Sequence, residues 1–210
     1  MKIENQERIW DAISDLWKTF RSTPVPEAAE FLRTRKGKIL DLGCGSGRNF
    51  VKTEGVIYGV DFSKNQLKFA GQFAKEEKLK VKLFKTTADS LPFQNDFFDS
   101  AIFINALHCI AGKKKRENSL RELFRVMKPG AEAMIMVWNK NQERFRNEKK
   151  DLVIHWKRDG VPYPRYYYLY DEKELLKLLE KVGFRIVRRW SIEKPEGNSK
   201  RNIIVLVRKL

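Results

Sequence analysis

The organisation of this chain is set by the stretch Ile39-Leu40-Asp41-Leu42-Gly43-Cys44-Gly45-Ser46-Gly47-Arg48-Asn49-Phe50. Apolar residues around Asp41 predict a buried strand, and three glycines in five positions predict a tight turn after it. Glycine adopts positive φ readily and lets the backbone approach a ligand closely. We therefore expect the amides of this turn to face a polar or anionic group where the next helix begins.

The spacing of the glycines argues against two common phosphate-binding motifs. A dinucleotide fingerprint reads G-x-G-x-x-G, and a P-loop ends in Gly-Lys-Ser or Gly-Lys-Thr. This turn reads G-x-G-x-G and no lysine follows it. The next apolar run ends at Asp61, twenty positions after Asp41, where a doubly wound fold places the carboxylate that binds a ribose diol. The alternative is a turn with a purely structural role.

Together the glycine turn and Asp61 resemble the signature of class I S-adenosylmethionine-dependent methyltransferases. The resemblance implies a Rossmann-like α/β fold, with a mostly parallel seven-stranded sheet flanked by helices, and S-adenosylmethionine as cofactor. The cofactor-binding positions that we carry over are Asp41, Gly43, Cys44, Gly45, Gly47, Asp61, Phe62, Asp89, Ser90 and Asn105.

Later segments follow in the order that this family shows. The run 98–104 is similar to the family's fourth strand, and Asp89 before it matches an acidic residue that contacts the adenine amino group. The alternative role for Asp89, taken alone, is a helix or turn cap. Apolar spacing predicts a helix that includes Met127 and stops at Lys128-Pro129-Gly130, an ending that also resembles the family.

The remaining apolar patterns complete one domain over residues 1–210. Within it, we expect residues 1–36 to form an N-terminal helical lid and residues 139–170 to form an insertion on the substrate side. Further helices are expected over 4–20, from 27, from 63 and over 171–183, and further strands at 56–60, 81–84, 133–138, 184–190 and 202–207.

The composition describes a soluble globular chain of 210 residues, with 42% hydrophobic and 33% charged residues. No apolar run approaches the roughly 20 residues of a membrane span, and residues 1–5 do not resemble a signal peptide. We therefore expect a cytoplasmic protein that does not contact membranes. Two cysteines and two histidines at scattered positions show no metal-ligand spacing, so no intrinsic metal site is expected.

The net charge of +16 comes from 43 Lys and Arg against 27 Asp and Glu. A thermophile-like surface enriches both signs and need not leave such an excess. A polyanionic partner explains the excess better, and nucleic acid is the commonest one.

A closer resemblance is to the eukaryotic tRNA wobble-uridine methyltransferases. It is carried by Arg21-Ser22-Thr23-Pro24-Val25-Pro26, by Ala106-Leu107-His108, and by Arg165-Tyr166-Tyr167 leading into Tyr170-Asp171-Glu172. Val25 departs from a tryptophan in the family, and Cys109 from a histidine. The resemblance implies a tRNA anticodon substrate, methyl esterification of carboxymethyluridine, and a small zinc-binding activator protein as partner.

Basic and aromatic residues alternate in the insertion at 139–170, a composition that suits phosphate contacts and base stacking. The basic residues expected to flank the pocket are Arg144, Arg146, Lys149, Lys150 and Arg165. The alternative is a solvated basic loop whose tyrosines pack on the domain.

Methyl transfer from a sulfonium is an in-line displacement, so the enzyme mainly positions the reactants and excludes water. A carboxylate acceptor is already ionised at pH 7 and needs orientation rather than a base. Candidates for that role are Arg21, Arg165 and His108, and Trp138 is a candidate for stacking a base. His108 as a capping or core histidine and Trp138 as a packing residue are the alternatives.

Two other functions share the cofactor motifs. A methyltransferase for a quinone, sterol or other metabolite would have an apolar pocket and little use for a charge of +16. An inactive RNA-binding or activator subunit would have a damaged cofactor turn, whereas this turn is intact.

Overall fold

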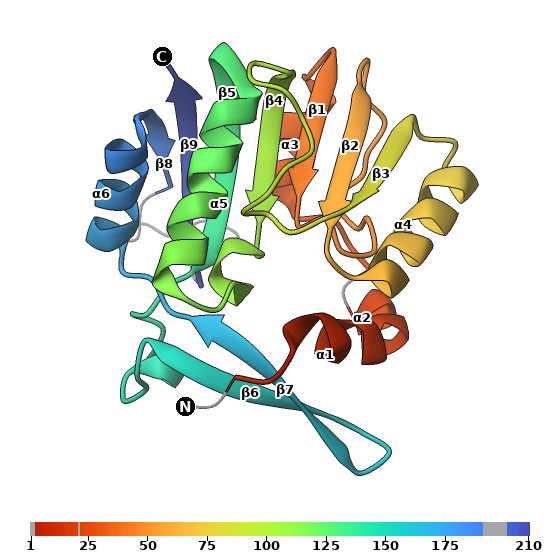
Figure 1. The fold of residues 1–210 in the computed structure, drawn as a ribbon, viewed down its shortest axis with the longest axis vertical. Helices are drawn as coiled ribbons and strands as arrows, with labels where there is room; N and C mark the ends of the chain where they lie inside the picture. Colours follow the sequence, from red (N-terminus) through yellow and green to blue (C-terminus); the bar gives the residue numbers. More distant parts are fainter. Residues whose placement is uncertain (1–2, 21, 191–200) are drawn as a thin grey trace.

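The computed structural model describes residues 3–20, 22–190 and 201–210, which contain a seven-stranded sheet in the order β3-β2-β1-β4-β5-β9-β8 (Figure 1). The first four pairings along this order are parallel, and β9 runs antiparallel to both β5 and β8. The strands are β1 (Lys38–Leu42), β2 (Val56–Asp61), β3 (Val81–Lys85), β4 (Phe98–Ile104), β5 (Met127–Trp138), β8 (Phe184–Arg189) and β9 (Asn202–Lys209). The predicted Rossmann-like fold is confirmed.

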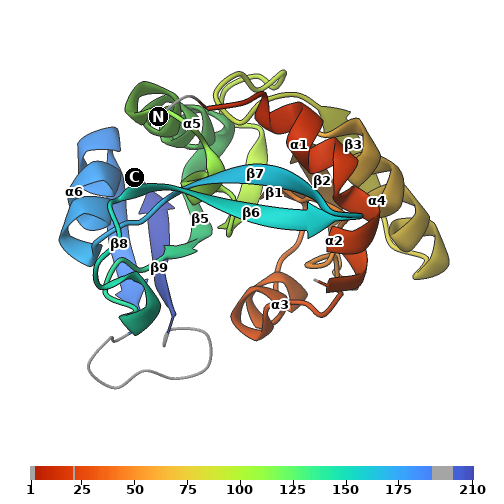
Figure 2. The ribbon, with the colours of Figure 1, turned by 90° about the horizontal axis from the view of Figure 1, so that it is seen from below.

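Helices cover both faces of the sheet, with α5 and α6 on one side and α3 and α4 on the other (Figure 2). The helices are α1 (Gln6–Ala12), α2 (Ser14–Phe20), α3 (Pro26–Arg33), α4 (Lys64–Glu76), α5 (Lys113–Val126) and α6 (Glu172–Val182), with short 3-10 helices η1 (Leu107–Cys109) and η2 (Glu143–Phe145). No described helix is long and apolar enough to cross a membrane.

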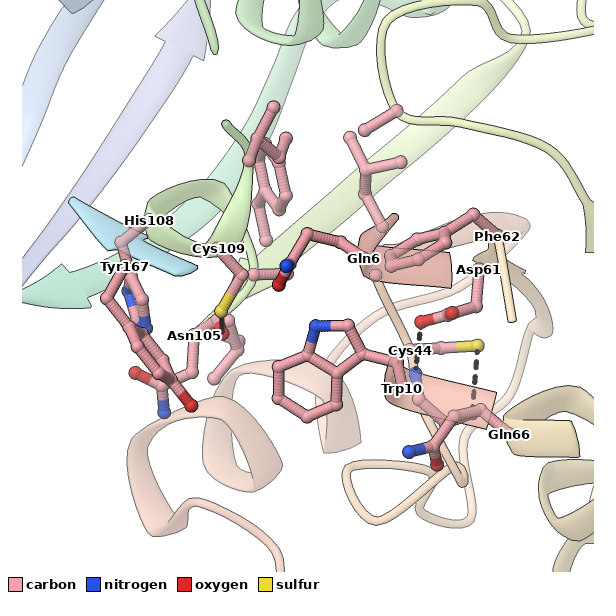
Figure 3. Close-up of a pocket in the computed structure, with 18 of the residues that line it drawn as sticks. Gln6, Trp10, Cys44, Asp61, Phe62, Gln66, Asn105, His108, Cys109 and Tyr167 are labelled. Carbon is pink, nitrogen blue, oxygen red and sulfur yellow. Dashed lines mark hydrogen bonds between the residues drawn. The ribbon is translucent and has the colours of Figure 1, made fainter. Parts of the chain in front are cut away.

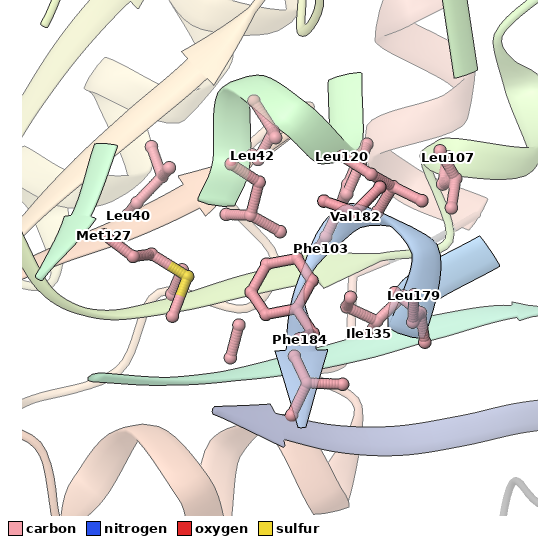
Figure 4. Packing of buried hydrophobic residues seen from close by; sticks show 14 of the residues in the cluster. Leu40, Leu42, Phe103, Leu107, Leu120, Met127, Ile135, Leu179, Val182 and Phe184 are labelled. Atoms are coloured by element: carbon pink, nitrogen blue, oxygen red, sulfur yellow. The ribbon is translucent and has the colours of Figure 1, made fainter. Parts of the chain in front are cut away.

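Both faces of the central strands are buried, which explains why these strands appear as unbroken apolar runs in the sequence. Successive side chains point to opposite faces, so Leu40 and Phe103 pack beneath α5 and α6, as Figure 4 shows. Their neighbours Ile39 and Ile102 pack beneath α3 on the other face. Each such buried side chain contributes about 1.5–3 kcal/mol to the stability of the fold.

The glycine turn is not followed by a helix, which corrects our expectation. Residues 43–55 reach β2 through turns and irregular backbone, without a helix. Because β1 and β2 are parallel, residues 48–55 must return along a strand of five residues, a distance of about 16 Å. Eight residues in a helix span only about 12 Å, so this link is too short to return through a helix.

Two other helix predictions are also corrected. The helix expected at 4–20 is divided into α1 and α2 at Ile13, which leaves helical geometry (φ −106°, ψ 5°) as its side chain is fully buried. Met127 does not belong to a helix, because α5 ends at Val126 and Met127 is extended (φ −78°, ψ 143°) and pairs with Phe98.

The helix α3, assigned to the N-terminal lid, packs instead against the sheet.

The insertion contains a β-hairpin, β6 (Asp151–Arg158) and β7 (Val161–Tyr168), and not the solvated loop that was the alternative. The strands are joined by Asp159 and Gly160, whose φ angles are 50° and 77°. Asp-Gly with positive φ at both positions is a favoured two-residue hairpin turn. The hairpin lies across the end of the sheet beside α1 (Figure 1).

Gly43 and Gly130 allow the packing of the glycine turn to be tested. Their φ angles are +72° and +79°, but a Cβ on Gly43 would lie 2.3 Å from Ala106 Cβ, whereas one on Gly130 would meet nothing within 4 Å. Alanine at either position costs about 1–2 kcal/mol of conformational strain. We expect Gly43→Ala to lower the free energy of unfolding by about 1–3 kcal/mol more than Gly130→Ala, measured by urea denaturation. Equal losses would contradict the close packing of the turn.

Candidate active site

A cavity of about 750 Å³ lies at the carboxyl ends of β1, β2 and β4. Its floor is the glycine turn and the ends of these strands, and its other walls come from α1, η1 and β7. Figure 3 shows Asp61 and Cys44 on one side, His108 and Tyr167 on the other, and the indole ring of Trp10 between them. Ligands of open α/β sheets bind at this edge.

Gly45 is the part of the glycine turn that a ligand can approach. Its φ is +54°, and a Cβ placed on it would meet only Gln66 Oε1, at 3.8 Å. The amides of the turn are already used within the protein: those of Gly43 and Cys44 donate to Val60 O, and that of Gly45 donates to Asp61 Oδ2. These three amides are therefore not available to an anion, and at Gly45 the turn offers close approach instead.

Asp61, the last residue of β2, holds the turn and the start of α4 together. Its Oδ2 accepts from the Gly45 amide and its Oδ1 accepts from the Ser63 amide, each at 2.9 Å. Burial raises the pKa of this carboxyl to about 6, although the backbone hydrogen bonds lower it. Each carboxylate oxygen has a second lone pair, so Asp61 can still accept hydrogen bonds from a ribose diol.

Asp41 lies beneath the turn with 1% of its surface exposed, and neither carboxylate oxygen has a hydrogen-bond partner. Burial raises its pKa to about 8, against the opposing influence of Arg48. An unpartnered buried carboxylate is costly unless a positive charge lies nearby. A ligand carrying an ammonium and a sulfonium group, as S-adenosylmethionine does, would supply such a charge.

The structure brings most of the expected cofactor residues together at the cavity. Those that line it are Gly43, Cys44, Gly45, Asp61, Phe62, Asp89 and Asn105. Asp41, Gly47 and Ser90 do not reach its surface. Asn105 has a left-handed backbone (φ 56°) and a buried, unpartnered side-chain oxygen, a combination of strain and unmet bonding that is typical of binding sites.

The opposite wall is an aromatic stack of His108, Trp138 and Tyr167. Trp138 and Tyr167 are parallel, with ring centroids 4.4 Å apart, and His108 lies 5.0 Å from Trp138. His108 is 1% exposed, and its Nδ1 accepts a hydrogen bond from the Trp138 amide at 3.1 Å. In this arrangement the imidazole proton is on Nε2.

The structure places Arg165, another expected catalytic residue, away from the cavity surface. Arg21 lies outside the described residues. Arg165 is 6% exposed and does not line the cavity, because Trp10 and Trp17 of the N-terminal helices cover it. It donates instead to the hydroxyl of Tyr167 at 2.6 Å.

Our choice of site residues from the sequence missed Tyr167 and the contributions of α1. Tyr167 belongs to the Arg-Tyr-Tyr motif. Only the prediction of a strand over these residues would have indicated that the Tyr167 side chain points to the same face as Arg165. Gln6 bonds to the backbone of β7, accepting from the Tyr166 amide at 2.9 Å and donating to Pro164 O at 3.1 Å. Nothing in its sequence context singles it out.

A methyltransferase-domain family model matches residues 40–135, the region containing the glycine turn, Asp61, Asp89 and β4. A solved S-adenosylmethionine-dependent methyltransferase from Methanosarcina mazei is 25% identical, with a TM-score of 0.72 over 90% of this chain and 99% of that chain.

The chain contains a class I S-adenosylmethionine-dependent methyltransferase domain. Its sequence is also similar to tRNA (carboxymethyluridine(34)-5-O)-methyltransferases. The protein from Xenopus tropicalis is 32% identical over 71% of this chain, and that from Arabidopsis thaliana is 32% identical over 65%. The matched regions span 23% and 33% of those two relatives.

A methyltransferase from Haloferax volcanii, solved in complex with the Trm112 activator, shares the fold at 14% identity, with a TM-score of 0.71 over 97% of each chain. Among the described residues, no group of three or more His, Cys, Asp or Glu side chains could hold a metal ion.

The raised pKa values of Asp41 and Asp61 predict opposite effects of pH on stability and on cofactor affinity. Both carboxyls bind protons more tightly in the folded chain than in the unfolded chain, so their contribution to apo stability is full below about pH 4. That contribution is lost as pH rises through about 6 and 8. A cationic cofactor favours the ionised carboxylates, so its affinity should rise with pH, by up to about tenfold per unit for each proton released.

Calorimetric titration with S-adenosylmethionine between pH 5.5 and 7.5 tests this prediction, with the proton release measured in buffers of different ionisation enthalpy. Asp41→Asn should flatten the profile. Asp61→Asn should weaken binding by about 1.5–3 kcal/mol, as expected for lost hydrogen bonds to a charged group. An affinity of the wild-type protein that is independent of pH would contradict the assignment of Asp41.

Proposed function

We propose that this methyltransferase acts on tRNA in the cytoplasm and forms the methyl ester of a carboxymethyl group on the wobble uridine. The observation that carries the proposal is the acceptor wall of the cavity, where cations accompany the aromatic stack. Lys115, Arg144 and Arg201 line the cavity, and the Arg144 guanidinium lies 4.7 Å from the ring centroid of Trp138. Aromatic rings with adjacent cations suit an unstacked base and its phosphates.

The similarity to carboxymethyluridine methyltransferases supports the same substrate class. The net charge of +16 also favours a polyanion over a small neutral metabolite. The cofactor turn retains its positive-φ glycines and its bond to Asp61, which supports an active enzyme over an inactive subunit. A small-molecule methyltransferase remains the competing function.

Arg144, Arg146 and Lys149 are exposed and are the members of the expected basic group that fit phosphate contacts. Lys150 is held in ion pairs with Asp171 and Glu174, and Arg165 is buried. The proposal therefore assigns the phosphate contacts to Arg144, Arg146 and Lys149.

The residues of the acceptor wall suit a reaction that needs no general base. S-adenosylmethionine supplies an electrophilic methyl group when bound, and an ionised carboxylate attacks without losing a proton. His108 presents an Nε2 proton because Nδ1 accepts from Trp138, so its geometry favours donation to an anionic acceptor. Burial raises the pKa of Cys109 to about 12, which keeps this cavity-lining thiol protonated. Trp138 is already stacked on Tyr167, so a base that stacked on Trp138 would have to use its other face.

Transfer of radiolabelled methyl groups to total tRNA lacking this modification tests the proposal. We expect label in a uridine methyl ester, identified by nucleoside mass analysis. Binding should weaken with salt by about 0.7 log unit per phosphate contact per decade. Arg146→Ala with Lys149→Ala should reduce this slope, and Lys36→Ala, a surface change near the opposite end of the sheet, should not. Label confined to small molecules would favour the metabolite enzyme.

The same assay, run with and without a small zinc-binding activator of the Trm112 type, tests the proposed partner. The resemblance to the wobble-uridine enzymes leads us to expect higher turnover with the activator. Full turnover by the isolated chain, unchanged on its addition, would remove the partner from the proposal.

A pH profile separates the proposed role of His108 from base catalysis. With a carboxylate acceptor, the rate at saturating cofactor should be flat above about pH 5, because a carboxylate is ionised there. His108→Asn should lower the rate without changing the shape of the profile. A wild-type rate that rises through about pH 6.5, with the rise abolished by His108→Asn, would identify a base and hence a nitrogen or hydroxyl acceptor.

A further inference from the structure

Arg165 is a buried cation without a counter-ion among the described residues. Its side chain is 6% exposed, no carboxylate in those residues forms an ion pair with it, and Nε has no hydrogen-bond partner. The guanidinium lies 4.8 Å from the ring centroid of Trp17 and 5.3 Å from that of Trp156. Nη1 donates to the hydroxyl oxygen of Tyr167 at 2.6 Å.

This arrangement leaves the positive charge of Arg165 only partly compensated. Aromatic rings stabilise a desolvated cation but carry no net negative charge. An anion in the adjacent cavity would complete the compensation. Arg165 does not line that cavity, whereas Tyr167 does. The hydroxyl of Tyr167 is therefore the group through which the charge can act on a ligand.

The Tyr167 side chain is oriented for this role. Its ring is fixed against Trp138, 4.4 Å away and 8° from parallel, and lies 5.8 Å from His108. Its oxygen accepts from Arg165, so its hydroxyl proton is directed to another acceptor. A donor that itself accepts from a cation is polarised and gives a stronger hydrogen bond.

We propose that Tyr167 is a catalytic residue that donates to the anionic acceptor, and that Arg165 is a positioning residue that acts through the Tyr167 hydroxyl. The proposal rests on the proposed function, because it requires an anionic group on the acceptor. Tyr167 and His108 then form two neutral donors on one wall of the cavity. They orient the carboxylate towards the methyl group without forming a covalent bond to it.

The N-terminal helices keep Arg165 in place. Trp10 and Trp17 cover the guanidinium, and Gln6 bonds to the backbone of Pro164 and Tyr166 on either side of it. Packing of α1 and α2 therefore sets the position of Arg165 relative to Tyr167.

A double-mutant cycle on methyl transfer to tRNA tests the proposal with wild type, Tyr167→Phe, Arg165→Met and the double variant. We expect each single change to lower kcat/KM by about 10- to 100-fold, the range for lost hydrogen bonds to a charged group. In the Tyr167→Phe background, Arg165→Met should cost no more than about twofold further. Tyr163→Phe is the matched control, because Tyr163 lies on the same face of β7 but not at the cavity, and it should change kcat/KM less than twofold.

Cofactor affinity of each variant, measured by calorimetry, shows whether the fold and the cofactor side remain intact. If Arg165→Met fails to bind cofactor, the cycle is run with Arg165→Lys, which keeps the charge and should lose less activity than Tyr167→Phe. Independent, multiplicative effects of Arg165 and Tyr167 would overturn the proposal, because they would place Arg165 in direct contact with the acceptor.

Analysis of the product separates this proposal from the proposed function. Ester formation with independent effects overturns the role of the Arg165–Tyr167 pair and leaves the tRNA carboxylate activity standing. Coupled effects together with methylation of a nitrogen or hydroxyl group overturn the proposed function, and with it the role of Tyr167 as donor to an anion.

Discussion

The hydrogen bonds accepted by Asp61 connect the parts of this protein that form its site. One oxygen holds the Gly45 amide and the other holds the Ser63 amide, so the cofactor turn and the start of α4 share one carboxylate. Asp11 of α1 extends the connection by accepting from the Asn65 amide at 3.0 Å. These hydrogen bonds therefore fix the positions of the glycine turn, α4 and the N-terminal helices relative to one another. A ligand that binds Asp61 depends on the positions of all three.

The two sides of the cavity have opposite electrostatic requirements. Asp41 and Asp61 are buried carboxylates whose pKa values are raised because burial outweighs their stabilising contacts. Across the cavity, Arg165 is a buried cation whose hydrogen bond goes to a neutral phenol. A cationic methyl donor on one side and an anionic acceptor on the other would satisfy both requirements, and would also attract each other across the transfer path.

The hairpin contributes to the core with one face and to the site with the other. Tyr166 and Tyr168 point towards α5 and α6, where Tyr166 bonds with Arg116 and Tyr168 bonds with Glu174. Arg165 and Tyr167 point towards α1 and the cavity. Because successive side chains of a strand point to opposite faces, the motif Arg-Tyr-Tyr-Tyr both anchors β7 to the core and supplies side chains to the site.

The sequence alone determined the fold class and the cofactor, because glycines with positive φ and a carboxylate at a strand end are local requirements of the turn. It also contains the Asp159-Gly160 pair, which is typical of a two-residue hairpin turn. Only the tertiary structure decided that Tyr167 lines the cavity and that Arg165 does not. Both residues lie on one face of β7, and their difference comes from Trp10 and Trp17, about 150 positions away in the chain. Contacts between residues so far apart in the chain produce no local pattern in the sequence from which they could be predicted.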